Sequence, residues 1–263
     1  MTDDVTLSVS QFHEAWRVLC ARGPAPRGES SGGVDFVFSG LPNPFFNVAL
    51  PSGGPLTADA LASRARRARE WAAGAGVPWL FIVTRELLEP GVDAAAVLEP
   101  CGLAPALTLT GMAADDVAPP AARADGLSIA EPHDRASCDA IIDVNANAYG
   151  MDLEACKPSF TPEFWAAHVP MLGLADGVPV ASSAVMMVDG CRYVAMVATL
   201  QSHQRRGYAE AVMRRSLEVA ARRHGMRPTV LHATEAGRPV YARMGYRTIA
   251  NHVAFVEGAP AAH

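Results

Sequence analysis

The chain from Gly126 to about Glu257 alternates between segments whose apolar residues recur at two-residue spacing and segments whose apolar residues recur at helical spacing. The first kind predicts strands at 127–130, 171–175, 180–188, 193–199, 229–232 and 246–256. The second kind predicts helices at 134–147, from 161 onward, at 206–223 and at 238–244. This order predicts an α+β fold, in which a mixed and mainly antiparallel sheet is flanked by helices.

Residues at the ends of these segments support the assignment. Asp134 and Thr161 are candidate N-caps, and Pro162 suits the first position of a helix. Asp-Gly turns separate the three central strands, which favours antiparallel hairpins. The long helix ends before Gly225, where a glycine is a common stop signal. Its apolar face at helical spacing consists of Ala209, Val212, Met213, Leu217 and Ala220.

The first half of the chain repeats part of this order. The same patterns predict helices at 5–21 and 57–73 and strands at 34–38, 46–50 and 79–83. Val48-Ala49-Leu50 precedes Val197-Ala198-Thr199 by 149 positions, and Gly76 precedes Gly225 by the same offset. We interpret this as two tandem copies of one architecture. The alternative is a chance recurrence of the strand-helix-strand unit, which is common in α/β proteins.

A stretch rich in alanine, aspartate and proline separates the two halves. Residues 114–125 are small or polar and contain Pro119 and Pro120, a composition typical of a linker. The predicted organisation is therefore a first domain at 1–118, a linker at 119–125 and a second domain at 126–263.

Composition and charge exclude several function classes. The chain has 263 residues and a formal net charge of -5, so it offers no bulk positive field to nucleic acid or to an acidic membrane surface. No apolar run reaches membrane-spanning length, and the acidic N-terminus lacks the apolar segment of a signal peptide. The five scattered cysteines form neither a disulfide framework nor a CxxC pair. We expect a cytoplasmic protein without a metal, either a monomer or a homodimer.

A short motif follows the third central strand and opens the long helix: Gln204-Arg205-Arg206-Gly207-Tyr208-Ala209. The first turn of a helix leaves backbone N–H groups unpaired, and the helix dipole adds positive potential there. Such a helix start suits a phosphate group, and Gly207 lets the backbone come close because it has no Cβ. Arg205 and Arg206 add positive charge. Taken alone, the same pattern would also fit an ordinary helix start with a small residue.

With its surroundings, the motif resembles the signature of the GCN5-related N-acetyltransferase (GNAT) family, Gln/Arg-x-x-Gly-x-Gly/Ala. Three predicted strands precede it, and the segment Tyr241-x-x-x-Gly245-Tyr246 resembles the family's closing segment, which usually ends Tyr-x-x-x-Gly-Phe. The resemblance covers about residues 126–257. Tyr246 is a mild departure from this pattern, and Ala209 replaces the commoner second glycine.

The resemblance implies an acyl-CoA-dependent N-acyltransferase that moves an acetyl group from acetyl-CoA to an amine by direct attack in a ternary complex. Backbone amides of residues 205–210 would hold the pyrophosphate of coenzyme A, and the preceding strand end would pair with its pantetheine arm. The implied cofactor-binding residues are Val197, Ala198, Thr199, Gln204, Arg205, Arg206, Gly207, Tyr208, Ala209, Glu210 and Thr234. Thr234 stands where many relatives carry an Asn or Ser that touches the arm, although it could instead cap the following helix.

Tyr241 is the implied catalytic residue, because the family often places a tyrosine near the coenzyme A sulfur. Its phenol would protonate the departing thiolate; the alternative is a half-buried aromatic that packs on the sheet. The general base stays open, and the candidates by residue type are Asp152, Glu154, Glu163, His168 and His232. A covalent intermediate on Cys156 is disfavoured, because the family normally transfers the acyl group directly.

The first half lacks these parts. In place of the motif it has the segment 55–60, Pro-Leu-Thr-Ala-Asp-Ala, which contains no glycine and adds an acidic residue, and Leu98 replaces Tyr241. We interpret this half as a degenerate copy that serves structure or shapes the acceptor site, and we expect one cofactor per chain. The alternatives are a non-catalytic acyl-CoA sensor and transfer of a longer acyl group through a channel lined by Met186, Met187 and Met196.

Overall fold

The computed structural model describes residues 3–119 and 124–258. In chain order, the first half contains α1 (Asp4–Cys20), β1 (Arg27–Ser31), β2 (Val34–Phe38), β3 (Asn47–Pro51), α2 (Ala58–Ala73), β4 (Leu80–Thr84), α3 (Ala94–Leu98) and β5 (Leu103–Ala114). The second half contains β6 (Ser128–Ala130), α4 (Arg135–Tyr149), α5 (Pro162–Ala166), β7 (Val169–Ala175), β8 (Val178–Val188), β9 (Cys191–Thr199), α6 (Tyr208–His224), β10 (Thr229–Thr234), α7 (Arg238–Arg243) and β11 (Arg247–Glu257). Short 3₁₀ helices lie at Pro44–Phe46, Arg85–Leu87, Glu99–Cys101, Glu154–Ser159 and Gln201–His203.

Every helix and strand expected from the sequence is present, and the ends differ by at most two residues. Three elements were not expected. Strand β1 is polar and exposed at four of its five positions, so it has no apolar alternation to detect. Strand β5 contains Pro105 and Gly111, which obscure a strand pattern, and α3 is only five residues long. Of the expected linker, residues 120–123 lie outside the described residues.

The chain divides into two compact units, each made of more than one stretch of the sequence. The first unit contains Met1–Met112, His232–Pro239 and Thr248–His263, and the second contains Ala113–Leu231 and Val240–Arg247. Most of β11 therefore groups with the first half of the chain, although it comes last in sequence. The division into domains at 1–118 and 126–263 remains a prediction.

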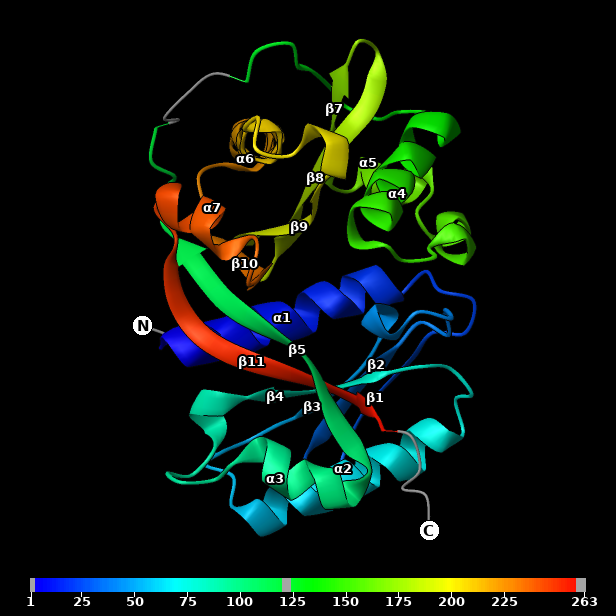
Figure 1. Ribbon diagram of the computed structural model, residues 1–263, viewed down its shortest axis with the longest axis vertical. Helices are drawn as coiled ribbons and strands as arrows, with labels where there is room; N and C mark the ends of the chain where they lie inside the picture. Colours follow the sequence, from blue (N-terminus) through cyan, green and yellow to red (C-terminus); the bar gives the residue numbers. More distant parts are fainter. Residues whose placement is uncertain (1–2, 120–123, 259–263) are drawn as a thin grey trace. The chain divides into compact units, whose positions relative to one another are not determined.

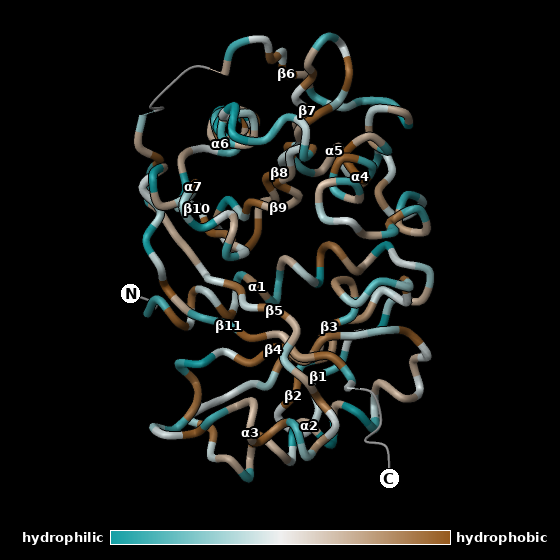
Figure 2. The backbone as a smooth tube through the Cα atoms, in the orientation of Figure 1, coloured by the Kyte–Doolittle hydropathy of each residue, from teal (hydrophilic) through white to brown (hydrophobic). Residues whose placement is uncertain are grey.

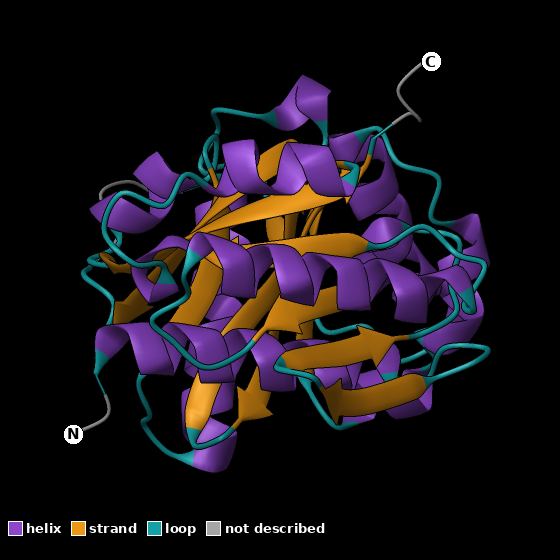
Figure 3. Ribbon diagram, turned by 90° about the horizontal axis from the view of Figure 1, so that it is seen from below, coloured by secondary structure: helices purple, strands orange, loops and turns teal. Residues whose placement is uncertain are grey.

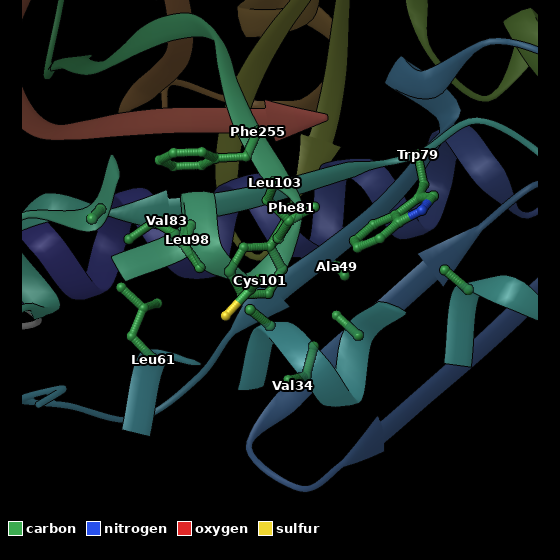
Figure 4. Packing of buried hydrophobic residues seen from close by; sticks show 14 of the residues in the cluster. Val34, Ala49, Leu61, Trp79, Phe81, Val83, Leu98, Cys101, Leu103 and Phe255 are labelled. Atoms are coloured by element: carbon green, nitrogen blue, oxygen red, sulfur yellow. The ribbon is translucent and has the colours of Figure 1, made fainter. Parts of the chain in front are cut away.

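In the first unit, the strands lie in the order β1-β2-β3-β4-β11-β5. The pairs β1–β2, β2–β3 and β4–β11 are antiparallel, and β3–β4 is parallel. Aromatic and aliphatic side chains from these strands pack with the buried side of α2 and with α3 to form one core. Figure 4 shows Phe81, Leu98, Leu103 and Phe255 together in this cluster, so β11 supplies part of the core.

In the second unit, the strands lie in the order β10-β9-β8-β7-β6, with antiparallel pairs except for β9–β10. Both Asp-Gly turns have left-handed conformations at both residues, as tight hairpins require: φ is 49° and 79° at Asp176 and Gly177, and 42° and 75° at Asp189 and Gly190. Helix α6 packs on one face of β7–β9, and α4 and α5 pack on the other (Figure 1).

The polarity of the chain agrees with this arrangement. Figure 2 shows hydrophobic colour along β8 and β9, while α6 carries both colours. The α6 residues that face the sheet are buried, among them Val212, Met213 and Leu217, which belong to the apolar face expected from the sequence. Helices pack against the strands throughout the described chain (Figure 3), and the fold is α+β with a mixed, mainly antiparallel arrangement of strands.

The two halves share one internal architecture. In each half a helix connects two strands that pair in parallel, β3–α2–β4 in the first and β9–α6–β10 in the second. Gly76, three residues after the end of α2, and Gly225, the C-cap of α6, both have positive φ, at 66° and 81°. Gly102 and Gly245, before the last strand of each half, do as well, at 76° and 94°. These correspondences agree with a tandem duplication.

Candidate active site

Strand β9 carries a β-bulge close to its C-terminal end. Ala195 pairs with Ala184 and Ala198 pairs with Ser182, so two residues of β9 oppose one residue of β8. Met196, inside the bulge, has a φ of 54°, which is left-handed and uncommon for a residue with a side chain. Such bulges bend a strand and are frequent beside active sites.

Beyond the bulge, two carbonyl groups of β9 turn away from β8. The N–H of Leu200 donates to the Val180 carbonyl on β8. Successive residues of a strand turn their polar groups to opposite edges, so the carbonyls of Val197 and Thr199 face the other edge. Side chains hold both of them: the Tyr149 hydroxyl donates to Val197 O at 2.7 Å, and Gln204 Nε2 donates to Thr199 O at 3.5 Å.

The motif, Gln204–Ala209, lies between this strand end and the first turns of α6. Arg205 and Gly207 are both left-handed, with φ of 62° and 77°. Helix α6 begins at Tyr208, two residues later than expected, and its N-cap Gly207 provides no side-chain hydrogen bond. A Cβ placed on Gly207 would meet nothing within 4 Å. Alternating conformations of this kind direct consecutive N–H groups to one side and favour an anion there.

Charges around this helix start favour an anionic ligand. Arg205 and Arg206 are exposed. The single acidic residue of the first turn, Glu210, is bound by Arg214, with Nη2 2.8 Å from the carboxylate, and Arg214 also donates to the Ala118 carbonyl. The Glu210 charge is therefore largely compensated. Of the other motif residues, Tyr208 is buried and its hydroxyl donates to Asp125 O at 3.1 Å, so only its backbone is available for a ligand.

Tyr241 lies in α7 and is half-buried. Burial, followed by the neighbouring hydroxyls of Tyr149 and Tyr246, raises the pKa of its phenol above the ordinary value, so the phenol stays protonated and can donate a hydrogen bond, although it is a weaker acid than a free tyrosine. Its ring also packs against Tyr246, with centroids 6.1 Å apart and an interplanar angle of 63°. Both interpretations of Tyr241, as an acid and as a packing residue, are compatible with this setting.

Thr234 ends β10 and belongs to the first unit, whereas the motif belongs to the second. Its hydroxyl accepts a hydrogen bond from the Gly237 N–H at 3.4 Å. That contact corresponds to the capping alternative, and its role toward coenzyme A stays a prediction.

The candidate bases differ in their surroundings. Glu154 is 2.6 Å from Lys157 Nζ and is thus paired. His168 is half-buried, burial lowers its pKa and so favours the neutral imidazole, and within the described residues its Nδ1 has no hydrogen-bond partner. His232 lies in the first unit, 3.0 Å from the hydroxyl of Ser8. Burial raises the pKa of the Cys156 thiol to about 11, which leaves it protonated and a poor nucleophile.

In the first half, the corresponding helix start is that of α2, and a side chain caps it. Thr57 caps α2, and its hydroxyl accepts from the Ala60 N–H at 3.1 Å. Asp59 adds a negative charge to the same turn. A side chain of the protein thus occupies the place that an anion would take, in contrast to the start of α6.

A cavity beside α6 lies in the second unit but away from the motif. It has a volume of about 220 Å³ and its lining includes Glu131, Arg215 and Arg222, but no residue of the motif. Among the described residues, no cluster of three or more His, Cys, Asp or Glu side chains is arranged to bind a metal ion. None of the described helices combines the length and apolar character needed to cross a membrane.

Comparison with known proteins identifies the class of this fold. A family model described as "Acetyltransferase (GNAT) domain" matches residues 190–249. A GCN5-related N-acetyltransferase from Kribbella flavida has a similar structure, with a TM-score of 0.72 and 22% identity, over 100% of this chain and 98% of that chain. A GCN5-related N-acetyltransferase-like protein from Streptococcus suis gives 0.58 and 12%, over 96% and 98%. No curated protein matches the sequence.

A solved tandem GNAT protein from the clavulanic acid biosynthesis pathway is also similar, with a TM-score of 0.50 and 16% identity, over 97% of this chain and 96% of that chain. The resemblance to the GNAT family is thus confirmed: a GNAT domain matches in the C-terminal half, and the whole chain has the fold of GNAT proteins, tandem ones included. The match supports acyl transfer in general.

Two groups that sequence reasoning did not single out lie at the bulged strand. One is Tyr149, and the other is the buried pair Asn145 and Ser182 behind Met196. No local pattern marks these residues, because their contacts with β8 and β9 lie between 14 and 51 positions away in the sequence.

Proposed function

We propose that this chain is an acyl-CoA-dependent N-acyltransferase that transfers an acetyl group from acetyl-CoA to a primary amine. The observation that carries the proposal is the uncapped start of α6 directly after a bulged strand, with Arg205 and Gly207 in left-handed conformations. Backbone strain at a residue with a side chain, as at Arg205, is typical of binding sites. Backbone N–H groups of residues 205–210 would hold the pyrophosphate of coenzyme A.

The edge of β9 beyond Tyr193, where the register with β10 ends, suits the pantetheine arm. The arm contains two amide groups, which can pair with an exposed strand edge as another strand would. Val197 and Thr199 turn their carbonyls to that edge. Without acyl-CoA, these carbonyls accept hydrogen bonds from the side chains of Tyr149 and Gln204. Binding of the arm would replace these side-chain hydrogen bonds with hydrogen bonds to the arm. Both carbonyl groups would therefore be hydrogen-bonded with and without acyl-CoA.

The reaction would proceed by direct attack. The amine nitrogen attacks the thioester carbonyl carbon, the new C–N bond forms, and the C–S bond breaks to release a thiolate. The thiolate takes a proton from the phenol of Tyr241, and the phenol regains a proton from solvent. Burial raises the pKa of this phenol, which keeps it protonated before the reaction and drives its reprotonation afterwards. The amine loses one proton to solvent or to a base such as His168. Proximity of the reactants alone can lower the barrier by ~7–11 kcal/mol, so a strong dedicated base is not obligatory.

Only the second copy would bind a donor. The first copy has its helix start closed by Thr57 and made acidic by Asp59. Leu98 stands at the end of α3, where the second copy has Tyr241 in α7. The first half would then contribute structure or part of the acceptor site.

The test is a panel of amines offered with acetyl-CoA, and with donors of longer acyl chain, while thiol release and the mass of the product are recorded. The panel includes small metabolites, amino acids, aminoglycosides and peptides with a free N-terminus or lysine. We expect thiol release that depends on both donor and amine and yields an acylated amine. Tight binding of coenzyme A without turnover against the whole panel would favour a sensor, and a preference for longer donors would replace the acetyl assignment.

A further inference from the structure

A buried hydrogen-bond network lies directly behind the bulge of β9. The hydroxyl of Ser182, on β8, donates to the Met196 carbonyl at 2.8 Å. The side-chain amide of Asn145, on α4, donates to Ser182 Oγ at 3.0 Å and approaches the Met196 carbonyl at 3.5 Å. The same amide donates to the Ile141 carbonyl one turn earlier in α4, at 2.8 Å. A helix, a central strand and the bulge are thus joined at one point.

The network is buried, where a polar group without a hydrogen bond destabilises the fold. Ser182 is 0% exposed and Asn145 is 4% exposed, and their hydrogen bond joins α4 to the sheet. A buried polar group is tolerated when it is hydrogen-bonded, and here the bonds converge on the carbonyl of the residue with the least favourable backbone conformation in the strand. A left-handed conformation at a residue with a side chain must be imposed by its surroundings.

Holding the Met196 carbonyl fixes the peptide that follows it. Because a peptide unit is planar, the direction of this carbonyl also sets the direction of the Val197 N–H. Val197 is the first residue whose carbonyl faces the free edge of β9, where Tyr149 now binds it. The orientation of that edge is therefore set from the inside of the protein, through Asn145, Ser182 and the Met196 peptide.

We propose that Ser182 and Asn145 are positioning residues for acyl transfer: they lock the bulge so that β9 presents the thioester in the orientation that attack requires. This inference rests on the proposed function. Neither residue touches the donor. Most of the donor affinity would come from the helix start at Gly207, so loss of the network should act on the chemical step more than on donor binding.

The chain contains a matched control for the neighbouring position. Ser183 follows Ser182 on β8, is also 0% exposed, and its hydroxyl forms one hydrogen bond across the other face of the sheet, 3.1 Å from Ser216 on α6. Ser182→Ala and Ser183→Ala remove the same atom from adjacent buried positions, and each removes a buried hydrogen bond. Ser183 opposes the bulge through its backbone, which alanine leaves unchanged, and only the side chain of Ser182 donates to the Met196 carbonyl.

The test compares kcat, KM for the acyl donor and the Kd of coenzyme A in the wild-type chain and the two variants, at a temperature where all are folded by circular dichroism. Ser182→Ala should lower kcat by about 10-fold or more, since misplacement of reacting groups by about 1 Å can cost about 100-fold. KM and Kd should change less than about three-fold, because the helix-start contacts persist. Ser183→Ala should keep the wild-type kcat. Ser182→Thr, which retains the hydroxyl, should recover part of the rate.

If Ser182→Ala does not fold, Asn145→Leu takes its place in the kinetic comparison, because leucine has a similar shape and removes the amide donor. Equal kcat values in the Ser182 and Ser183 variants, on an active wild-type background, would overturn this inference and leave the proposed function standing. A wild-type chain that releases no thiol from any donor would refute the proposed function and this inference with it.

Discussion

Acid should destabilise the first unit through His252, which lies in β11 and is 2% exposed. Both ring nitrogens are engaged: Nε2 is 3.0 Å from the hydroxyl of Ser8, and Nδ1 is 3.0 Å from the hydroxyl of Thr84. Ser8 Oγ is also 3.0 Å from Nε2 of His232, so two imidazoles share one hydroxyl. Burial lowers the pKa of His252 to about 4, and the opposing effect of the Glu86 carboxylate is smaller.

The size of the effect follows from this pKa. An imidazole in the unfolded chain titrates near ~6.5, so folding lowers the pKa of His252 by about 2.5 units, worth about 3 kcal/mol at about 1.4 kcal/mol per unit. Between these two pKa values the unfolded chain binds a proton that the folded chain does not. The contribution is therefore fully present above about pH 6.5 and is lost as the pH falls toward about 4. Burial and the neighbouring His252 lower the pKa of His232 as well. His232 therefore also lowers the free energy of unfolding as the pH falls.

The assay is urea unfolding at a series of pH values between about 4.5 and 7.5, for the wild-type chain and for His252→Gln. Glutamine does not titrate, and its amide can bond to both hydroxyls. Most carboxylates titrate equally in both proteins, so the difference between the two curves reports His252 together with its effect on the neighbouring His232. The free energy of unfolding should fall with acid more steeply in the wild type, by up to about 1.4 kcal/mol per pH unit. Parallel curves would refute the reasoning.

Three further predictions concern the candidate active site. Tyr241→Phe keeps the ring and should lower kcat by about 10-fold or more with little change in donor KM; an unchanged kcat, with an acceptor for which chemistry limits the rate, would make Tyr241 a packing residue. Tyr149→Phe frees the Val197 carbonyl and should lower the donor KM by up to about five-fold, whereas a higher KM would show that the hydroxyl assists the donor. Calorimetry should give one coenzyme A per chain, and two equivalent sites would contradict the closed helix start at Thr57.

Features set by neighbouring residues could be predicted from the sequence. The caps at Asp134 and Thr161 accept hydrogen bonds from backbone N–H groups three residues later, as expected. The Asp-Gly turns adopt the conformations that tight hairpins need. The motif was placed correctly between β9 and α6, and its glycine is the N-cap. These features depend on a few adjacent side chains, which a sequence displays directly.

Features set by distant contacts could not be predicted. Met196 gives no sign of a left-handed conformation in the sequence, because the side chains that bind its carbonyl, Ser182 and Asn145, come from other elements. Arg205 is similar, since a residue with a side chain rarely adopts its conformation. The grouping of β11 with the first half depends on strand pairing, such as His252 with Thr84, over a long stretch of chain. Apolar patterns predict that a strand exists and leave its partner open.

The most direct measurement for the central claim is a calorimetric titration of coenzyme A into the wild-type chain, Gly207→Glu and Gly177→Glu. Gly177 is a matched control, because its φ of 79° is close to the 77° of Gly207 and a Cβ at either position meets nothing within 4 Å. Each variant therefore carries the same added charge and a similar backbone strain of about 1 kcal/mol. The account predicts one site in the wild type and in Gly177→Glu, and no measurable binding in Gly207→Glu. Normal binding by a folded Gly207→Glu chain, or no binding by the wild type, would contradict it.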